Sequence, residues 1–328
     1  MSSYFPQPAS DVPPAPAAAD CWYLTGPTAA GKTAVGIELA KRIGAEIVVL
    51  DSMTVYAGMD IGTAKPTAEQ RAAVPHHLLD VAAPSEDYSL SQYIDAAHEA
   101  IADIRGRGRE VLFVGGTALY LKSLLRGVYQ GPPADWEFRR EIEREVEQVG
   151  SAALHQRLAV VDPLAAAKLH PNDKRRIIRA LEVHRQTGQP LSHRQTQFDE
   201  GRPAEQCKVF VLQWPRDELH RRIELRVDQM FVAGLVDEVR GLLDRYGSLS
   251  RTASQAVGYR EVLEHLAGGA SLEETIEKVK ARTRQFARRQ ETWFRGLSEC
   301  TFVPVEEEEP AVAVASRIQD LVAQRTQG

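Results

Sequence analysis

The sequence predicts an α/β protein built on a parallel sheet, with a helical insertion between two parts of that sheet. Three short apolar stretches, 22–25, 46–50 and 110–114, have the character of strands, and helical patterns separate them. Strand and helix alternating at this spacing are typical of a parallel sheet. The next strand-like stretch, 208–214, comes only after a long charged, helical region, so residues 131–200 are predicted to be the insertion.

Local signals place the remaining elements. A Gly-rich loop at 26–33 leads into a helix that extends to about Arg42. Ser89 and Gln92 have capping-box spacing, and the helix after them carries its apolar face on Leu90, Tyr93, Ile94, Ala97, Ile101 and Ile104. Behind Trp214, amphipathic helices are predicted over 216–246, 254–267 and 272–296.

These elements divide the chain into five expected segments. They are a disordered tail rich in Pro, Ala and Ser (1–20), the first part of the core (21–130), the insertion (131–200), core completion with C-terminal helices (201–305), and an acidic tail with a terminal helix (306–328). The Glu306–Glu309 run is interpreted as solvated, without catalytic meaning.

Composition indicates a soluble protein of a reducing cytoplasm. No apolar run approaches the roughly 20 residues that cross a bilayer, so no membrane partner is expected, and the N-terminus lacks the pattern of a secretory signal. Cys21, Cys207 and Cys300 are far apart and odd in number, which gives neither a disulfide framework nor a zinc spacing. We interpret them as buried apolar residues.

Charge is unevenly distributed along the chain. The net charge of −5 argues mildly against a nucleic-acid partner. Residues 168–194, however, hold seven Lys/Arg against Asp173 and Glu182, and residues 282–295 hold five Arg against one Glu. These local excesses of +5 and +4 are compatible with binding a phosphate backbone.

The strongest local motif is a G-x4-G-K-T phosphate-binding loop with a strand before it and a helix after it. It consists of Gly26, Pro27, Thr28, Ala29, Ala30, Gly31, Lys32 and Thr33. Such a loop turns its amides toward phosphate oxygens, while the lysine supplies a cation and the threonine hydroxyl can bind Mg²⁺. The motif predicts a diphosphate-like ligand, but it does not distinguish ATP from other diphosphates.

Asp51 follows the stretch EIVVL, at the sheet edge where α/β sites form. Its position alone leaves three interpretations open: an Mg²⁺-holding acid, a base acting on an acceptor, and a loop cap.

His76 and His77 have no third ligand at metal spacing, so a structural role is favoured. In 272–296, Val279, Phe286 and Trp293 share a face that is interpreted as core packing.

Taken together, these residues give a chain that resembles the tRNA dimethylallyltransferases, also called tRNA isopentenyltransferases. The matching stretches run in order from residue 26 to 295: GPTAAGKT, DSMTVYAGMDIGTAKP, HHLLD, GGTALYLKSLL, PNDKRRIIRALEV, RRIELRVDQM, AVGYRE and TRQFARRQETWFR. The sequence shows no C-terminal Cys/His zinc module, and in this it resembles the compact bacterial form of the family. The resemblance implies a P-loop, nucleotide-kinase-like core whose helical insertion grips the anticodon stem-loop of tRNA.

The resemblance also implies an activity and the residues that carry it. A dimethylallyl group would pass from dimethylallyl diphosphate to the exocyclic amine of the adenosine just 3′ of the anticodon, in tRNAs that read codons beginning with U. Thr28 to Thr33 would hold the diphosphate with Mg²⁺, Lys32 and Arg226 would assist its departure, Asp51 would deprotonate the amine, and Thr117 would lie beside the reaction channel. We expect a monomer.

By the same resemblance, tRNA would be contacted by Asp51, Ser52, Met53, Thr54, Thr117, Arg139, Arg175, Arg176, Ile177, Ile178, Arg179, Gln255, Ala256, Val257, Gly258, Tyr259 and Arg260. One position departs from the family pattern, because many members carry Gln where this chain has Thr54. Thr54 is too short for the same contact, which puts recognition of a neighbouring base in doubt without affecting the chemistry.

Overall fold

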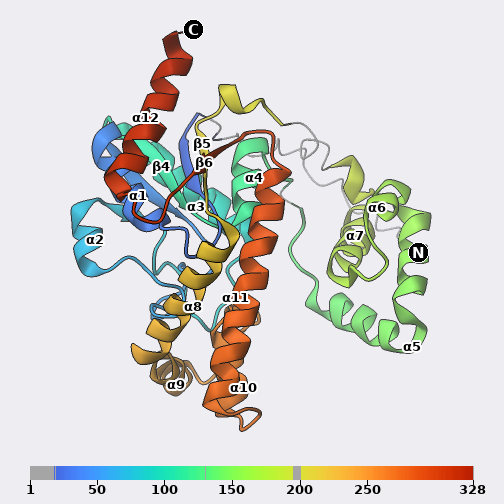
Figure 1. Cartoon of the computed structure of the whole chain (residues 1–328). Coiled ribbons are helices and arrows are strands. Elements are labelled where there is room, and N and C mark those ends of the chain that lie inside the picture. The colour runs from blue at the N-terminus through green and yellow to red at the C-terminus, as the bar shows by residue number, and fades with distance from the viewer. Residues whose placement is uncertain (1–17, 19, 130, 195–200, 328) are drawn as a thin grey trace. The chain divides into compact units, whose positions relative to one another are not determined.

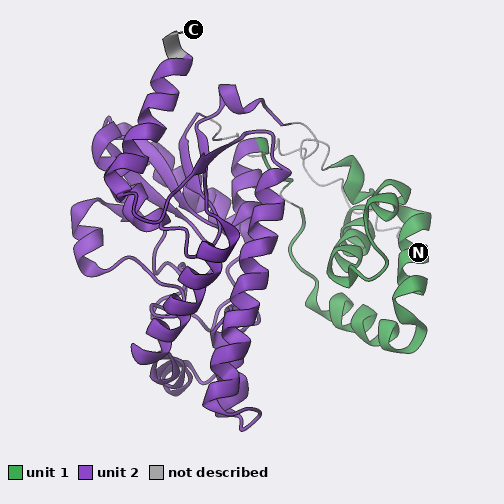
Figure 2. Cartoon of the chain, viewed as in Figure 1, with its two compact units in different colours: residues 1–17, 126–200 green, residues 18–125, 201–328 purple. Residues whose placement is uncertain are grey.

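The structure, a computed structural model, describes residues 18, 20–129, 131–194 and 201–327. They divide into two compact units, a helical unit within 126–200 and an α/β unit within 18–125 and 201–328 (Figure 2). Residues 1–17 and 19 of the expected tail lie outside the described residues. Ala18, by contrast, is buried, and its amide donates to the Leu124 carbonyl at 2.7 Å.

The α/β unit contains a six-stranded sheet in which every described pairing is parallel (Figure 1). The strand order is β3-β2-β4-β1-β5-β6. In chain order the strands are β1 (Trp22–Thr25), β2 (Ala45–Leu50), β3 (His76–His77), β4 (Glu110–Gly115), β5 (Val209–Gln213) and β6 (Cys300–Pro304). The predicted parallel α/β fold is therefore confirmed.

The helices of this unit cover both faces of the sheet. They are α1 (Lys32–Ile43), α2 (Ala68–Ala73), α3 (Leu90–Gly106), α4 (Ala118–Arg126), α8 (Arg216–Val232), α9 (Leu235–Tyr246), α10 (Tyr259–Leu266), α11 (Leu272–Arg295) and α12 (Ala311–Gln327). Side chains of α1, α8, α11 and α12 share one core cluster with alternate strand residues such as Leu24 and Leu112. The intervening Tyr23 and Phe113 point the other way and stack at 4.9 Å, as expected for the two-residue period of a strand.

Most predicted helices occur where the pattern placed them. The α3 capping box of Ser89 and Gln92 is present, and its apolar face is buried except at the half-buried Leu90. The single helix predicted over 216–246 was wrong, because the chain breaks it into α8 and α9 at Gly234. Gly234 adopts φ = 97°, a left-handed conformation that a helix interior excludes.

The C-terminal end contributes more to the core than the sequence indicated. No strand was predicted after residue 300, yet β6 pairs with β5 along its whole length and forms one edge of the sheet. In α12, Val314, Ala315 and Ile318 are fully buried in the core cluster with α1, beside which α12 lies in Figure 1. Only the Glu306–Glu309 segment between them is mostly exposed.

The helical unit has a core of its own. It contains α5 (Trp136–Val161), α6 (Pro163–Lys168) and α7 (Lys174–Thr187). Its buried apolar residues include Phe138, Ile142, Leu158 and Ile177, and α5 bends at Gly150, where φ is 82°. Within the described residues, no helix of either unit combines the length and apolar character that crossing a bilayer requires.

Candidate active site

The phosphate-binding loop connects β1 to α1 at the carboxyl edge of the sheet. Gly31 caps α1 with φ = 83°, and no side chain caps the helix's first turn, so its amides are available to a ligand. The Lys32 ammonium folds back along the loop, donating to the carbonyls of Gly26 at 3.1 Å and Pro27 at 2.7 Å. The loop lies between a strand and a helix, as the sequence motif requires.

Side chains from distant segments hold the carbonyls of this loop. Ala29 lies in the left-handed region with φ = 64°, which is strained for a residue with a Cβ. Arg222 on α8 donates to the Ala29 carbonyl at 3.0 Å, and the Trp214 indole donates to the Ala30 carbonyl at 3.0 Å. The Arg222 guanidinium also lies over the Trp214 ring, 4.2 Å from its centroid. Neither residue was predicted to support the site.

Two cations converge on the loop without a carboxylate partner among the described residues. Burial and, to a smaller extent, the charge of Arg226 lower the pKa of Lys32 to about 7, against the opposing attraction of Asp51. Burial likewise lowers the pKa of Arg226 from its ordinary value, against the attraction of Asp51. A bound anion would relieve the repulsion between these two cations, so the site is electrostatically suited to a diphosphate.

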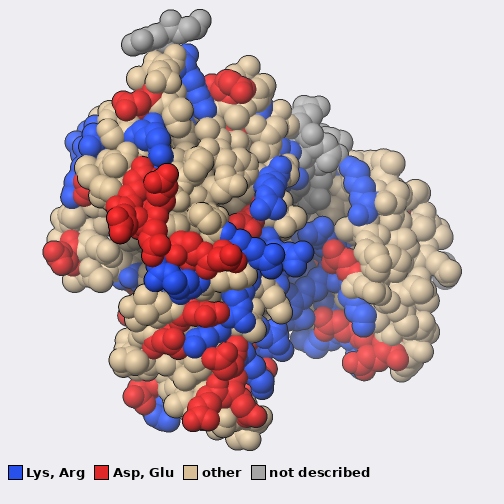
Figure 3. All heavy atoms as spheres, in the orientation of Figure 1, with Lys and Arg blue, Asp and Glu red and all other residues tan. Residues whose placement is uncertain are grey.

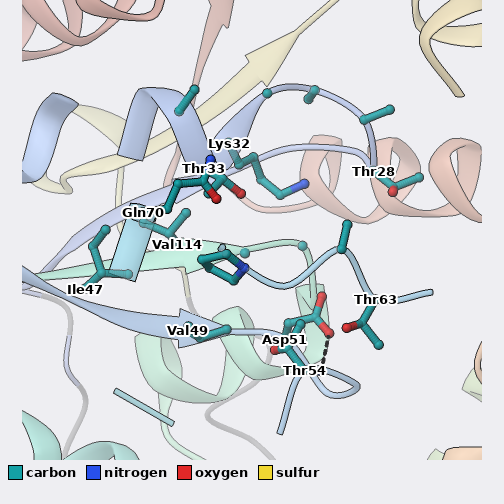
Figure 4. A pocket seen from close by; sticks show the side chains of 18 of the residues that line it. Thr28, Lys32, Thr33, Ile47, Val49, Asp51, Thr54, Thr63, Gln70 and Val114 are labelled. Atoms are coloured by element: carbon teal, nitrogen blue, oxygen red, sulfur yellow. Dashed lines mark hydrogen bonds between the residues drawn. The ribbon is translucent and has the colours of Figure 1, made fainter. Parts of the chain in front are cut away.

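Asp51 begins the loop that follows β2. Its Oδ1 accepts from the Met53 amide at 2.8 Å and the Thr54 amide at 3.3 Å, while Oδ2 has no partner among the described residues. The hydroxyl of Thr117, two residues after the end of β4, accepts from the Ser52 amide at 3.0 Å. One carboxylate oxygen therefore caps the turn, and the other is available to a ligand. Figure 4 shows Lys32 and Asp51 extending into the same space from opposite sides.

Two cavities meet at these residues, and both are lined by Thr28, Asp51, Thr63, Arg226 and Phe286. The first, of about 310 Å³, continues along the phosphate loop and past apolar residues of β2 and β4 to Ile47, Val49, Thr54, Gln70, His76 and Val114. The second, of about 280 Å³, continues to Ser52, Met53, Thr117, Val227, Met230, Gln255, Ala256, Val257 and Arg289. A donor and an acceptor could enter from separate sides and meet at Asp51.

Phe286 and Trp293 correct the interpretation of the α11 apolar stripe. Phe286 is half-buried and lines both cavities, and Trp293 is 38% exposed. Val279 is buried in the core as predicted, but the buried face of α11 then continues through Ala287, Gln290 and Phe294. The seven-residue spacing suggested one continuous packed face, but Phe286 of this stripe faces the cavities and Trp293 is partly exposed to solvent.

A carboxylate on α9 fixes the loop that carries Thr63. Glu238 accepts from the backbone amides of Asp60 at 2.9 Å, Ile61 at 2.7 Å and Gly62 at 3.4 Å. The Tyr259 hydroxyl donates to the same carboxylate at 2.5 Å. Tyr259, one of the residues expected at tRNA, is thus fully buried and used for support, and Glu238 was not predicted at all.

The other expected tRNA residues of the α/β unit have different surroundings. Gln255 is exposed and Val257 half-buried, whereas Ala256 and Gly258 are buried. Arg260 pairs with Glu264 at 3.3 Å. Thr54 is buried, with 6% of its surface exposed, and its hydroxyl has no hydrogen-bond partner among the described residues.

In the helical unit, the expected tRNA residues fall into two groups. Glu182 is fully buried and accepts from Arg139 through two bonds of 2.8 Å and from Arg179 at 2.5 Å. Burial raises the pKa of Glu182, but the two arginines outweigh that effect and leave the pKa below its usual value. Arg175 and Arg176 are exposed, while Ile177 and Ile178 are buried in the core of the unit. Arg175 and Arg176 are thus the exposed arginines of this set, and Arg176 also lies 3.4 Å from an Asp173 carboxylate oxygen.

The two histidines have structural contacts, as the sequence favoured. His77 lies 2.7 Å from a Glu46 carboxylate oxygen, and His76 Nδ1 lies 2.7 Å from the Val74 carbonyl. In the described residues no group of three or more His, Cys, Asp or Glu is arranged to hold a metal. The three cysteines are buried and free.

Comparison with known proteins identifies close relatives along nearly the whole chain. A family model described as IPP transferase matches residues 54–297. The chain is 47% identical over 318 residues to a tRNA dimethylallyltransferase of Rhodopirellula baltica, covering 94% of this chain and 95% of that protein. It is 49% identical over 280 residues to one of Geobacter metallireducens, covering 85% and 91%.

Solved structures that resemble this chain carry the same kind of name as the sequence relatives. The full-length tRNA isopentenylpyrophosphate transferase of Bacillus halodurans superposes with a TM-score of 0.66 at 39% identity, covering 94% of this chain and 98% of that one. A eukaryotic dimethylallyltransferase acting on tRNA superposes with a TM-score of 0.71 at 28% identity, covering 93% and 77%. The likeness therefore includes both units of the chain.

Proposed function

The chain belongs to the tRNA dimethylallyltransferase family, and from that premise we propose that it prenylates the adenosine just 3′ of the anticodon, in tRNAs that read codons beginning with U. The donor is dimethylallyl diphosphate and the acceptor is the exocyclic amine of that adenosine. The observation that carries the proposal is the junction of two cavities at Asp51, one lined by the phosphate loop and one by Thr117 and residues 255–257.

The diphosphate end of the donor occupies the phosphate loop. Lys32, Arg226 and the uncapped first-turn amides of α1 stabilise the negative charge that develops as the diphosphate leaves. The dimethylallyl group then lies in the apolar part of the first cavity. Its uptake displaces water from that part, which strengthens the electrostatic contacts at the reacting carbon.

The site also suits Mg²⁺. Thr33 lines the first cavity with its hydroxyl unpaired among the described residues, and Mg²⁺ is commonly held by one or two protein oxygens together with substrate phosphates. Thr33 and the diphosphate oxygens would hold the ion, which would neutralise part of the leaving group's charge. The protein itself supplies the remaining positive charge through Lys32 and Arg226.

The transfer step follows from this arrangement. The lone pair of the adenine amine forms a bond to C1 of the dimethylallyl group, and the C1–O bond breaks with its electron pair leaving on diphosphate. The amine proton passes to the free oxygen of Asp51. The adenine must first leave its stack, at a cost of a few kcal/mol, and contacts to the anticodon stem-loop offset that cost.

The helical unit supplies RNA contacts through its exposed arginines, Arg175 and Arg176, and the protein acts as a monomer. On the face drawn in Figure 3, basic and acidic side chains are interspersed over the α/β unit. Because charges more than about 10 Å apart are screened at moderate salt, a negative net charge does not prevent local phosphate binding.

A transfer assay with two labelled donors tests the proposal. Labelled dimethylallyl diphosphate and an unmodified anticodon stem-loop should give label in RNA, whereas labelled ATP should give none. A matched stem-loop with inosine in place of the target adenosine lacks the amine and should remain unlabelled. Transfer of the ATP label to any acceptor, or equal labelling of the inosine stem-loop, would contradict the proposal.

A further inference from the structure

Gln290 on α11 connects two parts of the site that lie far apart in sequence. Its side chain is 5% exposed. Its Oε1 accepts from the Thr28 amide in the phosphate loop at 2.9 Å, and its Nε2 donates to the Gly116 carbonyl after β4 at 2.8 Å. Both ends of one neutral amide are thereby used in a buried position, where unpaired polar groups are rare.

The contact at Gly116 requires the absence of a side chain. A Cβ at position 116 would lie 2.4 Å from Gln290 Nε2, a distance that real Cβ atoms do not adopt. Gly116 therefore allows the amide to reach the backbone. The close approach makes the position of the phosphate loop depend on the position of the chain just after β4.

The residue after Gly116, Thr117, is hydrogen-bonded to both neighbours of Asp51. The Thr117 amide donates to the Leu50 carbonyl at 3.1 Å, and the Thr117 hydroxyl accepts from the Ser52 amide at 3.0 Å. A continuous series of contacts thus runs from Thr28 through Gln290 and Gly116 to the two neighbours of Asp51. It joins the loop suited to the diphosphate to the carboxylate suited to the amine.

We propose that Gln290 is a positioning residue that sets the separation between the diphosphate loop and Asp51. The inference rests on the proposed function, because it concerns how the two substrates are brought into line. Transfer requires the amine to approach C1 opposite the leaving diphosphate, and a displacement of about 1 Å can lower such a rate by roughly 10²-fold. Gln290 lines the first cavity, but both hydrogen bonds of its amide are to backbone atoms, and it acts through the backbone on both sides.

The first test is Gln290→Glu, measured as the single-turnover rate with saturating donor and stem-loop. The ionised carboxylate can still accept from the Thr28 amide but repels the Gly116 carbonyl, so the rate at neutral pH should fall by roughly 10- to 100-fold. The dissociation constant for the stem-loop should change less than about threefold, whereas the constant for pyrophosphate should rise, because the new carboxylate lies beside the loop suited to the diphosphate. An effect confined to either dissociation constant would overturn the proposal.

The same variant has a pH signature. A protonated carboxyl both donates and accepts, as the amide does, so the ratio of variant to wild-type rate should rise as pH falls and protonates it. Gln290→Leu has no such group and should show a flat ratio. The exposed Gln324→Glu in α12 controls for the charge change and should match wild type at every pH. A flat ratio for Gln290→Glu would overturn the proposal.

A double-mutant cycle tests the contact between Gln290 and Gly116 by changing Gly116, and it remains available if Gln290→Glu does not fold. Gly116→Ala should slow transfer because its Cβ displaces the Gln290 amide, and adding Gln290→Ala should slow it little further. Additive reductions in rate would overturn the proposal. Failure of the proposed function is a distinct result, since wild type itself would then transfer no prenyl group.

Discussion

The two units use their arginines and lysines in opposite ways. In the α/β unit, Lys32 and Arg226 face a cavity without a carboxylate partner among the described residues. In the helical unit, the fully buried Glu182 engages Arg139 and Arg179, and Arg175 and Arg176 remain exposed. A count of basic residues therefore overstates the charge available to RNA, because some of it maintains the fold.

Asp51→Asn should have the largest effect. The amide oxygen can still accept from the Met53 and Thr54 amides, so the turn remains capped while the proton acceptor is removed. We expect the single-turnover rate to fall by roughly 10²–10⁴-fold with stem-loop affinity nearly unchanged. A nearly normal rate with a strongly altered Mg²⁺ requirement would instead identify Asp51 as a metal ligand.

Lys32→Met should cost about 2–4 kcal/mol of transition-state stabilisation, by analogy with the removal of one oxyanion donor. A matched control on the same helix, the exposed Lys41→Met, should retain the wild-type kcat/KM. Normal turnover with dimethylallyl diphosphate in Lys32→Met would remove the lysine from the reaction.

The same lysine predicts a pH dependence of pyrophosphate binding. The pKa of Lys32 in the free protein is lowered to about 7, so the ammonium is half protonated near pH 7 and is progressively lost as pH rises through that value. Affinity measured by titration calorimetry should fall with rising pH more steeply in wild type than in Lys32→Met. Because pyrophosphate itself titrates equally in both experiments, the difference between wild type and Lys32→Met isolates the contribution of the lysine. Identical slopes of affinity against pH for the two proteins would contradict the lowered pKa.

Glu182→Gln should affect stability and leave the chemistry intact. Removing the charge weakens the contacts to Arg139 and Arg179, and because both arginines are partly exposed we expect a decrease of about 2 kcal/mol in the free energy of unfolding. The folded pKa of Glu182 is lowered, so this contribution is present above about pH 4.5 and is lost as pH falls through the folded pKa.

Chemical denaturation at pH 7 measures the Glu182 effect, and the helical unit offers a matched control. Glu141 lies 3.8 Å from Arg185, with both side chains more than half exposed, so Glu141→Gln should change stability by less than about 0.5 kcal/mol. Equal effects of the two substitutions would show that burial does not distinguish the pairs.

Replacing Arg175 and Arg176 together by Ala should have the smallest of these effects, a change in the salt dependence of stem-loop binding. For each RNA phosphate that the variant no longer neutralises, the slope of log affinity against log salt should decrease by roughly 0.7–0.9, while the rate at saturating stem-loop stays near wild type. Arg42 and Arg240, exposed in the α/β unit, provide a control with the same change in net charge. Equal slopes for wild type and the Arg175/Arg176 variant would exclude both arginines from the RNA interface.

The sequence determined the features that lie within short, continuous segments. The G-x4-G-K-T loop fixes its own turn and the start of α1, and the end of a buried strand fixes the edge at which Asp51 lies. The capping box of α3 and the strands β1, β2, β4 and β5 could be predicted for the same reason. In each case the backbone geometry and the reactive group belong to neighbouring residues.

Tertiary structure alone decided which side chains support that site. Gln290 lies 262 residues from Thr28 and 174 from Gly116, and no local pattern links them. Glu238, Arg222 and the edge strand β6 have their roles for the same reason. Whether an arginine is free or paired depends on a buried carboxylate that packing brings beside it, as Glu182 does for Arg139. Such contacts depend on how separate segments pack, which the spacing of residues along one segment does not specify.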